Sequence, residues 1–360
     1  MDGGFNFPIF RTKREDIKKK FNLNDPAERQ EYFEFKAGRE IAKLKEYFSR
    51  GGTFVAYLLG KKNSGKGTYA KLFMEVVGAE HVGHMSIGDI IRDVEEGLST
   101  RAGKEAFLEF VRKNYRGFHS TEETLDFFKK RSTAVLLPSE LVVMLIKYEI
   151  SKRPRQAIFV DGFPRAMDQV TYSLYLRELI GYRDDPDFFV FISLPNAVID
   201  ERIKYRVICP ICKTPRSMRL LPTNNVGFDE AQKAFYLMCD GPSCKSARMV
   251  SKEGDELGVK PLEERLATDG KIMAQLLKLH GVPKVYLRNA IPVAQAKEYV
   301  DDYEITPAYE YEYDAAEKRV KVTERPWMVK DDEGELSYSL LPPAVCLALI
   351  KQTVAVLGLE

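Results

Sequence analysis

The stretch LLGKKNSGKGTYAKLF, Leu58 to Phe73, decides the fold, because an apolar run ends there in a glycine-rich loop and a helical pattern follows. Residues 60–68 fit the pattern G-x-x-x-x-G-K-[GST]-T. Glycines let backbone N–H groups approach phosphate oxygens closely, and the N-terminus of the following helix adds partial positive charge. The pattern therefore predicts a phosphate-binding P-loop, against the plainer alternative of a strand-to-helix turn with chance glycines.

Two side chains of this loop suit a bound nucleotide. Lys66 can reach the β- and γ-phosphates, and the hydroxyl of Thr68 can be a ligand of Mg²⁺. The loop residues that we expect to contact the nucleotide are Gly60, Asn63, Ser64, Gly65, Lys66, Gly67 and Thr68. A P-loop alone does not name the reaction, because motors, GTPases and kinases all use one.

Short apolar runs that alternate with helical patterns indicate the fold class. The runs lie at residues 53–60, 81–87, 156–162, 187–194 and 284–290. Strands of this kind between helices form parallel sheets that are covered on both faces. We therefore predict an α/β protein with a three-layer α/β/α core around a parallel sheet.

The other segments are predicted additions to this core. Residues 1–50 are expected to be a helical extension, with Asp25 as N-cap and Pro26 at the first helical position. The remaining expected divisions are the core at 51–302, with a helical insertion at 89–140 and a cysteine-bearing insertion at 206–256, then a Tyr-rich β-hairpin at 303–342 and a final helix at 343–360. The two end segments could cover sheet edges, form a dimer or bind a partner, and the sequence does not rank these roles.

Composition argues against several classes of protein. Of the 360 residues, 44% are hydrophobic and 30% are charged, with a net charge of +2. That near-neutral balance gives no support for binding to nucleic acid or to a membrane surface. No apolar run approaches the roughly 18 residues that span a bilayer, and the N-terminus does not resemble a secretory signal. We expect a cytoplasmic, monomeric protein.

Four of the five cysteines are candidate metal ligands. Cys209 and Cys212 form a C-x₂-C pair, and Cys239 and Cys244 form a C-x₄-C pair. Four thiolates on two loops suit tetrahedral Zn²⁺ and leave no open position for catalysis, so we expect structural zinc rather than free or redox-active thiols. Cys346, in an apolar stretch, is expected to lie in the core. The four histidines show no ligand spacing and are interpreted as structural or surface residues.

A second motif follows the predicted strand at 156–162. The segment VDGFPRAMDQ, residues 160–169, puts Asp161 at the end of that strand, where its carboxylate can hold Mg²⁺ through water. With this motif the chain resembles the adenylate kinase family of nucleoside monophosphate kinases, whose signature is D-G-[FY]-P-R. Further matches are MSIGDIIRD (85–93), LLPSELVV (136–143), DERIKYRV (200–207) and PLEERLA (261–267), and the resemblance covers residues 53–300.

The resemblance implies roles for the residues at these matches. The P-loop would bind ATP together with Arg202 and Arg206, Arg165 would hold the acceptor phosphate, and Gln169 would read the acceptor base. The implied acceptor-binding residues are Ser86, Ile87, Arg92, Leu137, Gly162, Arg165 and Gln169. The implied catalytic residues are Lys66, Arg165, Arg206, Arg248 and Arg265, with Mg²⁺ at Thr68 and Asp161. The insertion at 89–140 would be the acceptor-binding arm, and the insertion at 206–256 would be a zinc-bearing lid.

The implied reaction needs no catalytic base. Two polyphosphates repel each other, so the protein must align them, exclude water and surround the transferring phosphoryl group with cations. We expect ATP and AMP to give two ADP, with Mg²⁺ required and closure of the site protecting the phosphoryl group from water.

Departures from the family pattern leave alternatives open, and one of them is the enlarged acceptor arm between Arg92 and Pro138, which could narrow or cover the acceptor pocket. Ile87 stands where adenylate kinases usually have threonine, so UMP, CMP or another monophosphate is an alternative acceptor. Asn289 and Ala290 replace the glycine of the loop around the donor adenine, and Asn63 stands where the family's P-loop often has glycine. A nucleotide-binding regulatory or assembly module is an alternative of another class. Nucleic-acid binding through the cysteine-bearing insertion is a further one and predicts steep salt dependence.

Overall fold

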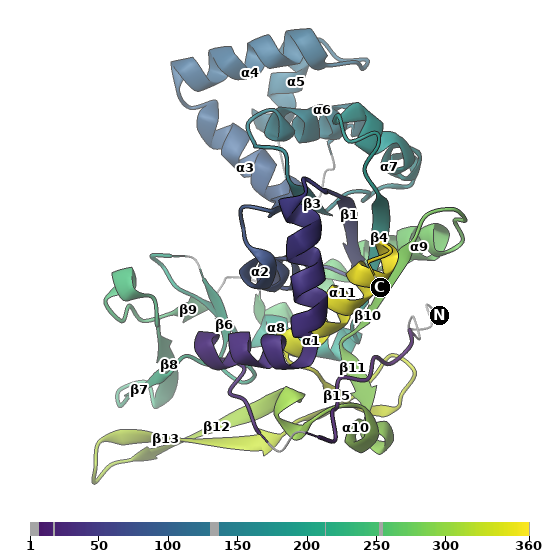
Figure 1. Ribbon diagram of the computed structural model, residues 1–360. Helices are drawn as coiled ribbons and strands as arrows, with labels where there is room; N and C mark the ends of the chain where they lie inside the picture. The colour runs from purple at the N-terminus through teal and green to yellow at the C-terminus, as the bar shows by residue number, and fades with distance from the viewer. Residues whose placement is uncertain (1–6, 17–18, 130–136, 213, 252–254, 360) are drawn as a thin grey trace.

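A five-stranded parallel sheet in the order β10-β4-β1-β3-β2 forms the centre of the protein (Figure 1). The computed structural model describes residues 7–16, 19–129, 137–212, 214–251 and 255–359. The central strands are β1 (Val55–Gly60), β2 (Val82–Ser86), β3 (Ala157–Asp161), β4 (Asp187–Ser193) and β10 (Lys284–Arg288). Each predicted apolar run forms one of these strands, so the predicted α/β class with a parallel sheet is confirmed.

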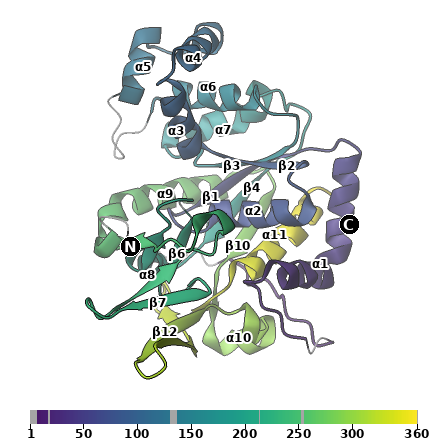
Figure 2. The same ribbon diagram turned by 90° about the vertical axis from the view of Figure 1, so that its left-hand side faces the viewer.

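Side chains of β1 alternate between two hydrophobic cores, because successive residues of a strand point to opposite faces of the sheet. Ala56 and Leu58 belong to one core, and Val55, Tyr57 and Leu59 belong to the other. The first core is covered by α1 (Pro26–Ser49), α2 (Lys66–Val77) and α11 (Pro342–Val356), and the second by α3 (Ile87–Gly97), α6 (Ser139–Ile150), α7 (Met167–Leu179) and α9 (Glu263–Leu277). Figure 2 shows α2, α11 and α1 on one side of the sheet and α9 on the other. The result is the predicted three-layer core.

The carboxyl ends of β1, β2 and β3 meet at one edge of the sheet. Leu58 of β1 and Ser86 of β2 are both register partners of Asp161, the last residue of β3. Loops that leave parallel strands at this edge form the usual binding crevice of open α/β sheets. The edge therefore brings together the P-loop after β1, the match MSIGDIIRD at the end of β2 and the motif VDGFPRAMDQ at the end of β3.

Two insertions project from this edge. The first continues α3 into α4 (Arg101–Asn114) and α5 (Thr121–Lys129), which lie beyond α6 at the top of Figure 1. The second follows α8 (Asn196–Lys204) and forms a lobe with one sheet of β5 (Arg206–Ile208), β6 (Pro215–Ser217) and β9 (Val250–Ser251) and a hairpin of β7 (Asn225–Asp229) and β8 (Ala234–Met238). We call this the cysteine lobe, because it carries the clustered cysteines.

The N-terminal segment is helical over only part of its length. Asp25 caps α1 as predicted, since its side chain accepts hydrogen bonds from the backbone N–H groups of Ala27 and Glu28. The helix bends at Ala37, where φ is −145°. The described residues before it, 7–16 and 19–25, contain no helix. Backbone N–H groups of Thr12 and Lys13 instead donate to the carbonyl of Tyr299, which holds this segment in an extended path on the core.

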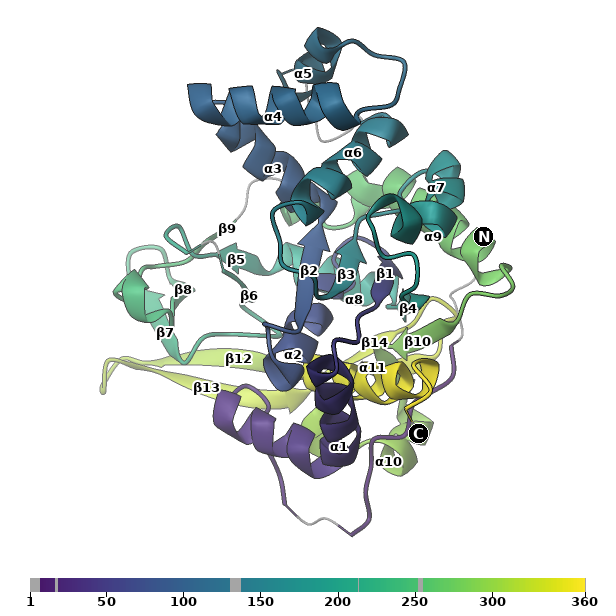
Figure 3. The same ribbon diagram turned by 45° about the horizontal axis from the view of Figure 1, so that its top comes forward.

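The C-terminal segment is more elaborate than the single hairpin that the sequence suggests. The strands β12 (Pro307–Asp314) and β13 (Arg319–Pro326) pair as an antiparallel hairpin. A separate antiparallel sheet joins β11 (Ala290–Pro292), β15 (Leu336–Ser339) and β14 (Met328–Lys330), with α10 (Val293–Tyr299) after β11. Figure 3 shows the β12–β13 hairpin along the cysteine lobe, where Tyr313 stacks on Phe228 with ring centroids 4.3 Å apart.

The predicted divisions of the chain stay predictions. Those at 1–50, 89–140, 206–256 and 343–360 each include residues outside the described part. Among them are 130–136 of the expected acceptor arm, the last of which is also the first residue of the match LLPSELVV. Among the described residues, every helix is too short or too polar to cross a membrane.

Candidate active site

The P-loop connects β1 to α2 and turns its lysine back toward the end of the sheet. Its tight path requires left-handed backbone at Asn63, with φ of 65°, and at Gly65, with φ of 97°. Lys66, the first residue of α2, donates from Nζ to the carbonyl oxygens of Gly60 at 2.9 Å and Lys61 at 3.1 Å. The ammonium group is thus held inside the loop that carries it.

Substitutions of Asn63 test the left-handed conformation of this loop. Asparagine tolerates the left-handed region better than most residues with a Cβ, and glycine adopts it freely. We expect Asn63→Gly to keep nucleotide affinity. We expect Asn63→Val to lower the free energy of unfolding by about 1–2 kcal/mol and to weaken ATP binding. Calorimetric titration and thermal unfolding of both variants measure this difference. Equal affinity and stability of the two variants would contradict the loop geometry.

Asp161 faces the P-loop lysine from the end of β3. Its carboxylate lies 3.8 Å from Nζ of Lys66 and 3.8 Å from Nε2 of His84, a residue of β2. Burial tends to raise the pKa of Asp161, but the nearby positive charge of Lys66 and the close contact with His84 outweigh it and lower this pKa below its ordinary value. Asp161 is therefore ionised at neutral pH and suited to bind a cation.

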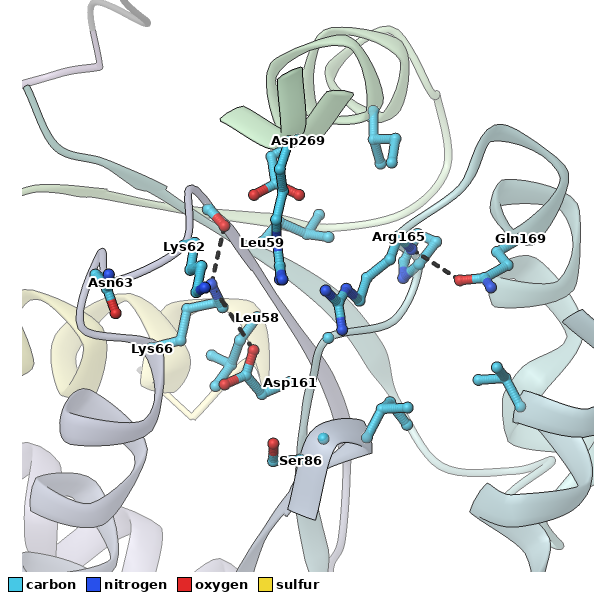
Figure 4. Close-up of a pocket in the computed structure, with 18 of the residues that line it drawn as sticks. Leu58, Leu59, Lys62, Asn63, Lys66, Ser86, Asp161, Arg165, Gln169 and Asp269 are labelled. Carbon is cyan, nitrogen blue, oxygen red and sulfur yellow. Dashed lines mark hydrogen bonds and ion pairs between the residues drawn. The ribbon is translucent and has the colours of Figure 1, made fainter. Parts of the chain in front are cut away.

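The GFPR turn that follows Asp161 directs Arg165 into the same space. Gly162 has a φ of 84°, and Gln169 accepts a hydrogen bond at Oε1 from the backbone N–H of Arg165 at 2.8 Å. Gln169 is buried, whereas the Arg165 side chain extends from the turn toward Lys66 and Asp161 (Figure 4). The attraction of Arg165 is one of the causes that lower the pKa of Asp161. The two motifs therefore share one electrostatic site.

A cavity of about 600 Å³ runs through this site. The predicted residues that line it are Gly60, Asn63, Lys66, Ser86, Ile87, Arg92, Leu137, Asp161, Gly162, Arg165, Gln169, Arg206 and Arg265. The predicted residues that do not line it are Ser64, Gly65, Gly67, Thr68, Arg202 and Arg248. Ser64 is buried in the loop and Thr68 is exposed on α2. The structure thus brings most residues of the phosphate motifs together.

The arginines near the cysteine lobe differ in position. Arg206 lines the cavity and makes two hydrogen bonds of 2.6 Å to the carboxylate of Asp255. Arg248 lies on the lobe away from the cavity, where it bonds Asp229 at 2.9 Å and packs over the ring of Tyr236. Since both partners of Arg248 belong to the lobe, its catalytic role stays a prediction that would require the lobe to move.

Arg202 and Asn289 lie together behind the P-loop. Arg202 is 3.5 Å from Oδ1 of Asn289, and the amide of Asn289 donates to the hydroxyl of Tyr69 at 3.1 Å. Asn289 is fully buried and also accepts a hydrogen bond from Ser339. The asparagine that departs from the family pattern therefore serves to join the C-terminal segment to the core.

Sequence reasoning missed one acidic and one basic residue of the cavity and one histidine beside it. Asp269 and Lys62 line the cavity, and His84 contacts Asp161. Burial raises the pKa of Asp269, against the opposing attraction of Lys66 and Arg265. The signal in the sequence was the helical spacing of four residues between Arg265 and Asp269, which puts both on one face of α9.

The cysteine lobe gathers its thiols as the spacing predicts. The Sγ atoms of Cys209, Cys212, Cys239 and Cys244 all lie within 4.8 Å of one another, and those of Cys212 and Cys239 are 3.7 Å apart. Tetrahedral zinc with Zn–S bonds of about 2.3 Å requires sulfur atoms about 3.8 Å apart. Hydrogen bonds with Thr214 lower the pKa of the Cys212 thiol to about 6, which favours a thiolate ligand. The four residues therefore fit a zinc ion.

The cavity combines the P-loop lysine, a carboxylate at the end of the neighbouring strand β3 and converging arginines. This combination defines a P-loop phosphotransferase. The adenylate kinases of Thermotoga petrophila, Thermotoga neapolitana and Clostridium acetobutylicum are similar in sequence. The two Thermotoga enzymes are 28 and 29% identical to this chain over 206 and 205 residues, and each match covers 56% of this chain and 76% of the relative. The Clostridium enzyme is 29% identical over 171 residues, which cover 47% of this chain and 67% of the relative. No protein-family model matches the chain. The chain is an adenylate kinase-like phosphotransferase, and the resemblance seen in its motifs is confirmed.

Proposed function

We propose that this protein is a nucleoside monophosphate kinase that transfers the γ-phosphoryl group of ATP to AMP and gives two ADP. One observation carries the proposal: Lys66 of the P-loop, and Asp161 and Arg165 at the end of β3 and the turn after it, line a single cavity. A binding module needs one phosphate site, whereas a transferase needs cations for both a donor and an acceptor. The P-loop supplies the first set and the GFPR turn supplies the second.

On the donor side, the P-loop holds the triphosphate and Lys66 contacts its terminal phosphates. Asp161 is a proposed ligand of Mg²⁺, since its carboxylate is ionised and lies beside the P-loop lysine. Thr68, which is exposed on α2 and does not line the cavity, is the second proposed ligand on the P-loop pattern alone. Mg²⁺ held there with ATP would supply positive charge that offsets part of the charge of the phosphate groups. The proposed donor site needs no proton acceptor.

On the acceptor side, Arg165 and Arg92 hold the monophosphate. Arg92 is largely exposed and pairs with Asp89 of its own helix, so this pair must open before Arg92 can bind a phosphate. Apolar side chains of Ile87, Ile91, Leu137 and Val142 line the cavity near Gln169 and suit a flat base. Ile87 offers no hydrogen bond, so Gln169 is the proposed source of base selectivity.

The transferring phosphoryl group would lie between Lys66 and the arginines. The Nε atom of Arg265 is buried and makes no hydrogen bond in the structure, which fits a residue that waits for an anionic ligand. Arg206 is the proposed partner of Arg265 across the hinge between the core and the cysteine lobe. Closure of that lobe would exclude water and protect the phosphoryl group from hydrolysis.

The four clustered cysteines are proposed to bind one structural zinc ion. Their place between α8 and α9 makes the cysteine lobe the proposed lid. A cytoplasmic location and a monomeric state, inferred from the sequence, stay predictions.

A coupled assay of ADP formation tests the proposed reaction. The purified protein is mixed with ATP, Mg²⁺ and one of AMP, UMP, CMP or GMP, and kcat/KM is measured for each acceptor. We expect AMP to be the best acceptor by about tenfold or more, because a base-reading amide discriminates by about one hydrogen bond to a buried group. A preference for UMP or CMP would change the acceptor but keep the reaction. Absence of turnover with all four would overturn the kinase and favour a nucleotide-binding module.

A further inference from the structure

The C-terminal segment, which the sequence left without a role, reaches back to the P-loop. The turn between β14 and β15 places Asp332 against Lys61, the second residue of the P-loop, 271 positions earlier in the chain. Their ammonium and carboxylate groups are 2.6 Å apart, with the Lys61 side chain 15% and the Asp332 side chain 16% exposed. An ion pair so shielded from water is stronger and better ordered than one on the open surface.

Both carboxylate oxygens of Asp332 are engaged. Oδ2 accepts the hydrogen bond from Nζ of Lys61, and Oδ1 accepts one from the backbone N–H of Asn196 at 2.7 Å. Asn196 is the first residue of α8, so the carboxylate also lies at the positive end of that helix. Asp332 therefore ties the start of the P-loop to the start of α8.

The neighbouring residue makes this position rigid. Asp331 accepts hydrogen bonds at Oδ1 from the backbone N–H groups of Glu333 and Glu335, at 3.0 and 2.9 Å. Ser337 donates to its other oxygen at 3.2 Å. The turn belongs to the β11-β15-β14 sheet, and β11 follows directly on the core strand β10. Asp332 is thus presented to the P-loop by a fixed turn.

Lys61 is linked by its backbone to the reactive lysine. Its carbonyl oxygen accepts hydrogen bonds from the backbone N–H of Ser64 and from Nζ of Lys66, both at 3.1 Å. Its side chain points to Asp332 and is not among the residues that line the cavity, whereas Lys62 is. The ion pair therefore fixes the first turn of the loop and holds the Lys61 side chain away from the cavity.

We infer that Asp332 is a positioning residue for the donor nucleotide, acting through Lys61 on the conformation of the P-loop. This inference rests on the proposed function only in naming the nucleotide of the P-loop as the donor. A preorganised loop binds phosphate without first becoming ordered, so loss of the ion pair should weaken donor binding and leave acceptor binding unchanged.

The test compares Asp332→Asn, Lys61→Met and the double variant. Asparagine keeps an oxygen for the N–H of Asn196 but removes the charge that pairs with Lys61. We expect each single variant to weaken binding of a non-hydrolysable ATP analogue by about fivefold, measured by calorimetric titration. We expect the double variant to bind no more weakly than either single variant, because both changes remove the same interaction. KM for AMP should stay at the wild-type value.

Glu333→Gln is the matched control, since Glu333 lies exposed on the same turn. It should bind and turn over like the wild type. The inference is overturned if the losses of the single variants add up in the double variant, if Asp332→Asn binds the analogue as tightly as or more tightly than the wild type, or if KM for AMP rises in parallel. A wild-type protein that binds the analogue but phosphorylates no acceptor would contradict the proposed function alone, because the coupling in analogue affinity could still be measured.

Discussion

Replacement of Lys66 by alanine is expected to reduce kcat by about 10²- to 10³-fold, which corresponds to about 3–4 kcal/mol of lost transition-state stabilisation. The ammonium of Lys66 lies at the closed end of the P-loop, 3.8 Å from Asp161 and bonded to the carbonyl of Gly60. Alanine leaves the developing negative charge on the phosphoryl oxygens without this fixed cation. The loss should appear mainly in kcat, because the backbone N–H groups of the loop still bind the triphosphate.

Lys71→Ala is the matched control, since Lys71 lies exposed on α2 and away from the cavity. Steady-state kinetics of ADP formation with both variants measure the effect, and thermal unfolding shows whether each variant is folded. The Lys66 side chain is 14% exposed and its pair with Asp161 is long, so the fold should survive its removal. If a folded Lys66→Ala variant retained wild-type turnover, the measured activity would come from another site or another protein.

The parts of the site that could be predicted from the sequence are those whose chemistry depends on short, local patterns. The P-loop needs its glycines at fixed offsets from Lys66, and the D-G-F-P-R turn needs Asp161 four residues before Arg165. The inner strands β1, β3 and β4 are nearly continuous apolar runs, because helices cover both faces of the sheet. Local spacing and the parallel sheet together bring these motifs to one edge.

The parts that could not be predicted depend on contacts between distant segments. From the sequence alone, Asp269 is expected to be a solvated residue on a helix. In the structure α9 packs against β1, and this packing brings Asp269 near Lys66. Strand β11 is three residues long and pairs with β15, which lies near the end of the chain. Such short strands are determined by their neighbours more than by their own propensity. The role of Asp332 depends on the same long-range pairing.

Removal of the proposed zinc ion from the cysteine lobe is expected to unfold that lobe and to lower turnover by about tenfold to a hundredfold, while nucleotide binding to the P-loop is kept. The lobe has a very small core of its own. Its buried cluster consists of Val207, Cys209, Leu237, Cys239, Cys244 and Met249. Half of these residues are thiols, so the apolar area that they bury cannot offset the conformational entropy of ordering the lobe. Four thiolates around zinc would supply the missing free energy.

The experiment is metal analysis, limited proteolysis and kinetics of a Cys239→Ser/Cys244→Ser double variant. We expect one zinc ion per chain in the wild type, none in the variant, and rapid cleavage between β5 and β9. Cys346→Ala is the matched control, because Cys346 is buried in α11 outside the cluster, and it should keep its zinc and its turnover. If the double variant resisted proteolysis and turned over like the wild type, the cysteines would not be what holds the lobe together. The contacts of Tyr311 and Tyr313 with Phe235 and Phe228 would then be among the contacts that stabilise it.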